Sequence, residues 1–308
     1  MTHPAPLRAQ VDPARFGAYR GWGELRVTLD ALEARGARRL LVGASVEGAP
    51  LEAFEVGPAD ADRATVILAG IHAMEWIGVE VGLALLERLV ADPPADRLVR
   101  VHPLVNVDGY RRVEGHLRHG RRRFDRTNAH GVDLNRNWPT HWKKGNRRAK
   151  VLPFLGDGGV SPLSEPEVER VERALLVLSE RMHVERALSL HSFGRKVLYP
   201  YGGRWRQVGD LHRHRAAAEA IADALPGYEA VQSSRWVPGA FAPGMEIDHL
   251  HDAFGALALL VECSGGGTRL RDPGSWLHPF RWFNPPDPEH VAARLAPVLE
   301  GFVRGALP

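Results

Sequence analysis

Short apolar runs that alternate with helix-like segments are the feature that most constrains the fold of this chain. Thr65–Gly70 (TVILAG) and Ala256–Val261 (ALALLV) are typical of buried strands. Ile77–Val90 instead spaces its apolar residues as a helix does. Strands that alternate with helices favour an open, twisted, mixed and mostly parallel sheet with helices on both faces. We therefore expect an α/β fold whose functional residues gather beyond the carboxyl ends of the strands.

The rest of the chain is expected to add strands and helices to the same sheet. Strands are expected at Arg39–Val42, Val99–Val105 and Arg186–Leu190, and helices at Trp22–Ala34, Ser164–Met182, Asp210–Leu225 and from Asp287 onward, the last kinked or interrupted at Pro297. Ser164 and Glu167 have the spacing of a capping box. The Asp-Gly pair within Asn106–Tyr110 favours a turn, and the irregular stretch that follows to about Ser161 is long enough to indicate a functional loop.

Length and composition indicate one folded domain. The chain has 308 residues, of which 44% are hydrophobic and 25% charged, as in an ordinary globular protein. We expect a single domain over residues 1–308, with residues 1–15 as a loosely ordered N-terminal extension. The net charge of +3 gives no reason to expect nucleic acid as a partner.

The N-terminal sequence and the cysteine count limit the expected cellular location and the possible kinds of metal site. Met1 to Gln10 lacks the apolar core of a secretion signal, and no apolar run is long enough to cross a bilayer. We therefore expect a cytoplasmic protein without a membrane partner, whose oligomeric state stays unknown. The single cysteine, Cys263, excludes an intrachain disulfide and a cysteine-rich zinc site. Any zinc site must use histidine and carboxylate ligands.

Polar side chains at the expected strand ends have the chemistry of a metal site. His72 and Glu75 are three positions apart, so that an imidazole and a carboxylate can converge on one cation. The alternative for this pair is a surface contact or a helix cap. A catalytic zinc site needs about three protein ligands and one open position, and His191 at the end of its strand fits as the third ligand. The alternative for His191 is a buried, hydrogen-bonded histidine.

Glu262 and the pair Asn135 and Arg136 add further candidates. Glu262 follows the apolar run ALALLV, and a carboxylate there is costly unless it is paired or acts near a cation. A salt-bridged structural glutamate is the alternative. Asn135 and Arg136 place an amide beside a guanidinium, whose planar fork matches a carboxylate.

Four motifs, in this order and spacing, resemble the carboxypeptidase A-type zinc metallocarboxypeptidase family. They are HAME at 72–75, GVDLNRNWP at 131–139, LHSFG at 190–194 and LLVE at 259–262. The resemblance extends from about Phe16 to the final helix. It implies one Zn²⁺ per chain, held by His72, Glu75 and His191. It also implies that Asn135 and Arg136 bind the substrate carboxylate and that Glu262 is the catalytic general base.

Two further features of the family concern substrate binding. The family uses an arginine upstream of the Asn-Arg pair to polarise the scissile carbonyl, and Arg126 is the favoured candidate here, with Arg123 second. The mobile tyrosine of the family has no counterpart in the stretch Trp236–His249, because no tyrosine follows Tyr228. Substrate clamping is therefore expected to differ.

The resemblance predicts a metallocarboxypeptidase, a zinc-dependent hydrolase that cleaves the last peptide bond of a peptide with a free C-terminal carboxylate. In the implied mechanism Glu262 removes a proton from a zinc-activated water and later protonates the leaving amine. One alternative is a related zinc deacylase of N-acyl amino acids, which shares HxxE and DLNR, although GVDLNRNWP and Glu262 favour peptides. A non-catalytic module that binds an anion such as nucleic acid is the other alternative, and the intact set of site residues argues against it.

Substrate preference is less constrained. Met245, Ile247 and Asp248 lie where this family often lines its side-chain pocket, and they favour an aliphatic or aromatic terminal residue. An arginine-rich segment instead indicates an acidic substrate or a solvated basic loop. It contains Arg111, Arg112, Arg118, Arg121, Arg122, Arg123 and Arg126. Cleavage of branched peptides is equally compatible with these residues.

Overall fold

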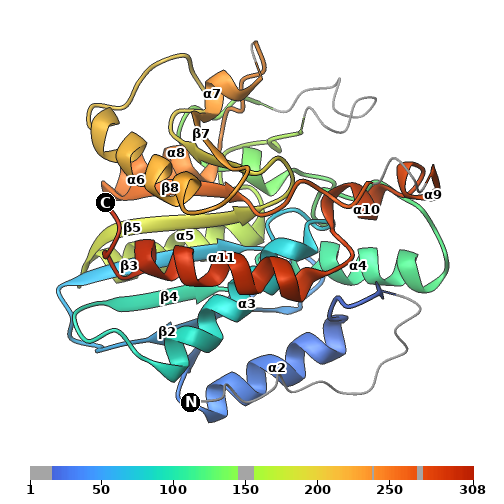
Figure 1. Ribbon diagram of the computed structural model, residues 1–308, viewed down its shortest axis with the longest axis horizontal. Helices are drawn as coiled ribbons and strands as arrows, with labels where there is room; N and C mark the ends of the chain where they lie inside the picture. The colour runs from blue at the N-terminus through green and yellow to red at the C-terminus, as the bar shows by residue number, and fades with distance from the viewer. Residues whose placement is uncertain (1–15, 145–155, 238, 269–272) are drawn as a thin grey trace.

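The computed structural model describes residues 16–144, 156–237, 239–268 and 273–308 of the protein. Within these ranges, eight strands form one mixed sheet in the order β1-β2-β4-β3-β5-β8-β6-β7 (Figure 1). The strands are β1 (Arg38–Ala44), β2 (Pro50–Val56), β3 (Arg63–Ala69), β4 (Leu98–His102), β5 (His183–His191), β6 (Lys196–Tyr199), β7 (Glu229–Gln232) and β8 (Leu257–Glu262). The central pairs β4/β3, β3/β5 and β5/β8 are parallel. The expected α/β fold around a mixed, mostly parallel sheet is confirmed.

Helices cover both faces of this sheet. They are α2 (Trp22–Ala34), α3 (Trp76–Ala91), α4 (Val107–Arg118), α5 (Pro166–Ser179), α6 (Leu211–Asp223), α7 (Ser233–Trp236), α8 (Glu246–Phe254), α9 (Pro273–Trp276), α10 (Pro279–Phe283) and α11 (Pro288–Val303), with a 3₁₀ turn, η1, at Leu134–Arg136. Figure 1 shows α3 and α11 in front of the strands and α5 behind them. No helix of the described ranges is long and apolar enough to cross a membrane.

Successive side chains of the central strands pack into different cores. Ile67 and Ala69 of β3 belong to the core that includes α3 and α11, whereas Val66 and Leu68 belong to the core that includes α5 and α8. Because both faces of such a strand are buried, its sequence is apolar throughout and does not alternate with polar residues. This is why the run TVILAG predicts a strand of a covered sheet.

The register of the parallel strands brings the candidate site together. Ala69 at the end of β3 pairs with Leu190 of β5, and His191 at the end of β5 pairs with Glu262 of β8. The carboxyl ends of these strands therefore meet at one edge of the sheet. The chain leaves β3 through a short turn into α3, so any polar side chain in that turn lies over the same edge.

The turn expected at Asn106–Tyr110 is wrong. Asn106 is the N-cap of α4, and its side chain accepts a hydrogen bond from the backbone N–H of Gly109 at 3.0 Å. The irregular stretch therefore begins only after Arg118. Asparagine caps helices as readily as it starts turns, so local composition does not distinguish the two outcomes.

The N-cap and the capping box expected at Ser164 are wrong. Glu165, not Ser164, is the N-cap of α5, and Pro166 occupies the first turn. The Glu167 carboxylate accepts a hydrogen bond from the backbone N–H of Val46 at 3.2 Å rather than completing a capping box. The last helix is not interrupted, since α11 continues through Pro297, and a kink at that residue stays a prediction.

Several elements were not expected from the sequence. Among them β2 carries Glu52 and Glu55, and the second of these is buried because it pairs with Arg100 at 2.8 Å. β6, β7 and α8 are too short to show a clear period. The single domain over residues 1–308 stays a prediction, and residues 1–15 lie outside the described residues.

Candidate metal centre

His72, Glu75 and His191 converge at the edge where β3 and β5 end. The His72 Nδ1 atom lies 2.8 Å from Glu75 Oε1, and His191 Nδ1 lies 3.0 Å from both His72 Nδ1 and Glu75 Oε2. All three residues are buried. The structure therefore brings together the three ligands that the resemblance implies.

This donor set fits a zinc ion. Zinc bonds of about 2.0–2.1 Å in a tetrahedral arrangement place the ligand atoms roughly 3.3 Å apart, close to the separations of 2.8–3.0 Å in this cluster. Two ring nitrogens that face each other at 3.0 Å repel when both carry lone pairs or both carry protons, whereas a cation between them satisfies both. Two imidazoles and one carboxylate leave a fourth position open, as in catalytic zinc sites.

Close packing of α3 against β5 sets the position of this cluster. Gly78 lies in the first turn of α3, and a Cβ atom there would lie 2.6 Å from the Leu190 carbonyl oxygen. Only glycine permits this approach, which brings Glu75 next to the end of β5. The backbone N–H of Ser192 then donates a hydrogen bond to Glu75 Oε2 at 3.1 Å.

Asp133 and Arg126 form the adjoining layer. Asp133 Oδ1 lies 3.1 Å from His72 Nε2, and Asp133 Oδ2 accepts a hydrogen bond from Arg126 Nε at 2.8 Å. Arg126 also contacts Glu75 Oε1 at 3.4 Å. Burial alone would lower the pKa of Arg126, but the charges of Asp133 and Glu75 raise it above its usual value. Of the two arginines considered, the structure places Arg126 in the cluster and leaves Arg123 exposed.

Glu262 lies beside the cluster at the end of β8. Its side chain is buried, and its Oε2 atom has no hydrogen-bond partner within the described part of the chain. Burial and the negative charge of Glu75 raise the pKa of Glu262 above its usual value. The salt-bridged structural alternative has no support here, because no ion pair to Glu262 occurs among the described residues.

Asn135 and Arg136 lie in the 3₁₀ turn η1, on the side of the cluster toward α8. Asn135 Oδ1 accepts a hydrogen bond from the backbone N–H of Glu246 at 3.1 Å. Arg136 donates to the Asn135 carbonyl at 2.6 Å, and its buried Nε has no partner in the described ranges. Burial lowers the pKa of Arg136 below its usual value, against the raising effect of Asp133. A carboxylate ligand would supply the missing partner.

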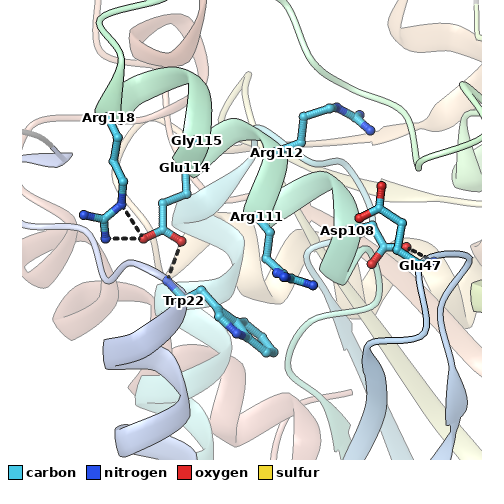
Figure 2. A pocket seen from close by; sticks show the side chains of 8 residues that line it. All are labelled: Trp22, Glu47, Asp108, Arg111, Arg112, Glu114, Gly115 and Arg118. Atoms are coloured by element: carbon cyan, nitrogen blue, oxygen red, sulfur yellow. Dashed lines mark hydrogen bonds and ion pairs between the residues drawn. The ribbon is translucent and has the colours of Figure 1, made fainter.

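The arginines of α4 and Arg126 do not form one basic surface. Arg126 is part of the cluster, and Arg112 donates to the Thr127 and Asn128 carbonyls at 2.6 and 3.1 Å. Figure 2 shows Arg111, Arg112 and Arg118 of α4 around an open cavity of about 480 Å³, where acidic and basic side chains are interleaved. The cavity is lined by Trp22, Glu47, Asp108, Arg111, Arg112, Glu114, Gly115 and Arg118. This mixture of charges favours the solvated alternative over an acidic-substrate site.

A second group of ligand-type side chains, Asp210, His214 and His251, is not a metal site. His214 Nδ1 lies 3.0 Å from Asp210 Oδ1, and His251 Nε2 lies 3.9 Å from the same oxygen. His214 Nε2, however, accepts a hydrogen bond from the backbone N–H of Ala258 at 3.3 Å. The proton of a neutral His214 therefore sits on Nδ1 and faces Asp210, which leaves no lone pair for a metal. Burial lowers the pKa of His214 to about 4, which keeps the ring neutral.

Sequence reasoning missed Asp133 and Glu246 as site residues. Asp133 lies inside the motif GVDLNRNWP, and this position in the motif was a signal that it belongs to the site. Glu246 is fully buried, and its Oε1 lies 3.0 Å from His191 Nε2. Its sequence neighbours Met245 and Ile247 carry no pattern that indicates this contact.

Comparisons with known proteins agree with this geometry. A family model described as zinc carboxypeptidase matches residues 27–272. Carboxypeptidase A6 of Homo sapiens is 32% identical over 206 residues, which are 62% of this chain and 46% of that protein. The chain thus spans about half the length of this relative.

Solved structures show the same fold at low identity. Bovine thrombin-activatable fibrinolysis inhibitor, in complex with tick carboxypeptidase inhibitor, matches with a TM-score of 0.72 and 22% identity over 94% of this chain and 98% of that chain. The murein-tripeptide amidase MpaA of Escherichia coli O157 matches with a TM-score of 0.55 and 22% identity over 88% of this chain and 94% of that one. Because the family model covers most of the chain, the protein belongs to the zinc carboxypeptidase family.

Proposed function

We propose that this protein is a zinc-dependent metallocarboxypeptidase that releases the last residue of peptides with a free C-terminal carboxylate. The observation that carries the proposal is the convergence of His72, Glu75 and His191 beside Glu262, whose Oε2 atom has no hydrogen-bond partner among the described residues. Membership of the zinc carboxypeptidase family supports zinc-dependent hydrolysis as the general class of chemistry. The positions of the side chains support the role proposed for each residue. A cytoplasmic location stays a prediction.

His72, Glu75 and His191 would hold the zinc ion. When bound, zinc acts as a Lewis acid that lowers the pKa of water and polarises a carbonyl group. The bound cation would also offset the negative charge of Glu75, whose effect on Glu262 is to raise its pKa. Glu262 would then be free to accept a proton.

Glu262 is the general base and acid in this proposal. Its Oε2 atom accepts a proton from the attacking water and passes it to the nitrogen of the leaving amine. The carboxylate is held at the end of a strand that is buried on both faces. It is therefore already in position before the substrate binds. A positioned base of this kind typically contributes about 10²- to 10⁴-fold to the rate.

Arginines bind the two oxygen-rich parts of the substrate. Arg126, beside Glu75, would donate to the scissile carbonyl oxygen as negative charge develops there, and one such donor is typically worth about 3 kcal/mol. Arg136, with Asn135, would bind the terminal carboxylate of the substrate. Its buried Nε has no partner in the part of the chain that the structure describes, which makes a carboxylate the fitting ligand.

The test is peptide hydrolysis on protein of measured zinc content. Peptides that differ only in their last residue should each lose that residue, and a chelator should stop the release. The same peptides with amidated C-termini are the matched control and should stay intact, because they offer Arg136 no carboxylate. Cleavage of amidated peptides at the same rate would contradict a carboxypeptidase, and preference for N-acyl amino acids would indicate the deacylase.

Glu262→Gln separates the base from the metal site. The variant should retain zinc, because Glu262 is not a ligand, and should lose at least about 100-fold in kcat. Unchanged kcat in the zinc-loaded variant would contradict the role of Glu262.

A further inference from the structure

The two nitrogens of His191 face different partners. Nδ1 points at His72 and Glu75, whereas Nε2 lies 3.0 Å from Ser189 Oγ and 3.0 Å from Glu246 Oε1. His191 and Glu246 are both buried, so water does not compete for these contacts. The position of the proton on a neutral ring is therefore decided by the side chains around it.

A metal ligand needs one tautomer of this ring. To present a lone pair at Nδ1, a neutral His191 must carry its proton on Nε2. The hydroxyl of Ser189 is compatible with either tautomer, because it can accept a hydrogen bond from Nε2 or donate one to it. A carboxylate only accepts, so Glu246 is compatible with the tautomer that frees Nδ1 and repels the other.

Glu246 is held firmly in this position. It begins α8, where the backbone dipole favours a negative charge, and its own N–H donates to Asn135 Oδ1 at 3.1 Å. Its Oε2 atom has no hydrogen-bond partner in the ranges described. A buried carboxylate with an unpartnered oxygen is costly for stability, so packing does not account for it.

We infer that Glu246 is a positioning residue that holds His191 in the tautomer able to bind the metal and thereby strengthens zinc binding. This inference rests on the proposed zinc site. The arrangement parallels that at His72, where Nε2 faces Asp133 Oδ1 at 3.1 Å. Carboxylates behind metal-binding histidines orient the ring and raise its basicity.

Zinc affinity of the metal-free protein tests the inference without any activity assay. Glu246→Gln keeps the size of the side chain but adds an amide that can donate to Nε2, so both tautomers become available. Competition with a chromophoric chelator should show zinc binding about 10- to 100-fold weaker than in the wild type. Ser189→Ala should weaken binding less, because Glu246 still selects the tautomer.

Glu172→Gln is the matched control. Glu172 Oε2 lies 3.0 Å from His249 Nε2, so this variant also breaks a buried glutamate–histidine contact against α8, but at a histidine outside the metal cluster. It should bind zinc as the wild type does. If Glu172→Gln weakens binding as much as Glu246→Gln, general loosening of α8 explains the effect and the inference is wrong.

Nitrogen chemical shifts of His191 give a readout that a structural role would not move. In the zinc-loaded wild type, imidazole ¹⁵N spectra should show a protonated Nε2 that donates to a carboxylate, and in zinc-loaded Glu246→Gln this signal should shift because an amide oxygen is a weaker acceptor. Unchanged affinity and an unchanged spectrum in Glu246→Gln would overturn the inference while leaving the zinc site intact. A wild type that binds no zinc would overturn both.

Discussion

Replacing His102 should remove part of the acid sensitivity of this fold. His102 ends β4 with 1% of its surface exposed, and its Nε2 has no hydrogen-bond partner in the described part of the chain. Burial, with the charge of Arg100, lowers its pKa from the ordinary 6.5 to about 3. The folded protein therefore keeps the ring neutral at pH 5, whereas the unfolded chain binds a proton.

The sign and size of the effect follow from this difference. Because the unfolded state binds more protons between pH 3 and 6.5, the free energy of unfolding falls as the pH falls through this window. A pH of 5 is 1.5 units below the ordinary pKa of 6.5, which His102 has in the unfolded chain. One unit corresponds to about 1.4 kcal/mol, so at pH 5 His102 lowers the free energy of unfolding by about 2 kcal/mol. At pH 7.5 the cost is close to zero.

Urea unfolding of the metal-free protein at pH 7.5 and pH 5 measures this cost. The wild type should lose about 2 kcal/mol more than His102→Leu between the two values. The control is His290→Gln, at an exposed histidine whose ring is in water in both states, and it should keep the wild-type difference. Equal losses in the wild type and His102→Leu would refute the reasoning.

Three other perturbations probe the site. Arg136→Ala should raise KM with a smaller change in kcat, measured by steady-state peptide hydrolysis, because the carboxylate anchor is lost; a change in kcat alone would contradict this. Gly244→Ala should destabilise the protein and weaken substrate binding, since its φ is +73° and a Cβ would lie 2.3 Å from the Arg136 carbonyl oxygen; an unchanged melting temperature would contradict this packing. Adding zinc at 100 times its Kd should raise the free energy of unfolding by about 2.7 kcal/mol, and a chelator should reverse the gain; no change would argue against the metal site.

Much of the fold could be read from the sequence where burial leaves a clear pattern. The runs at β3 and β8 are apolar because helices cover both faces of these strands, so their position and class were predictable. β2 was not, because its Glu52 and Glu55 interrupt the apolar pattern and are compensated by arginines from elsewhere in the chain. Local sequence cannot show such a partner in advance.

The helix boundaries show the same limit on a smaller scale. Asn106 caps α4 although a turn was expected there, and Glu165 caps α5 in place of the expected Ser164. The choice depends on whether a following segment finds a core to pack against. For α4 that core includes Val107, Tyr110 and Val113.

The sequence by itself determined the metal-site candidates, because His72 and Glu75 are close along the chain and His191 and Glu262 end apolar strands. The tertiary structure decided which arginine joins them, since Arg126 and Arg123 are indistinguishable by composition and only Arg126 reaches Asp133. It also decided the role of Glu246, which is 55 positions from His191 along the chain. A hydrogen bond depends on distance and direction in space, and neither is written in the local pattern of residues around a buried glutamate.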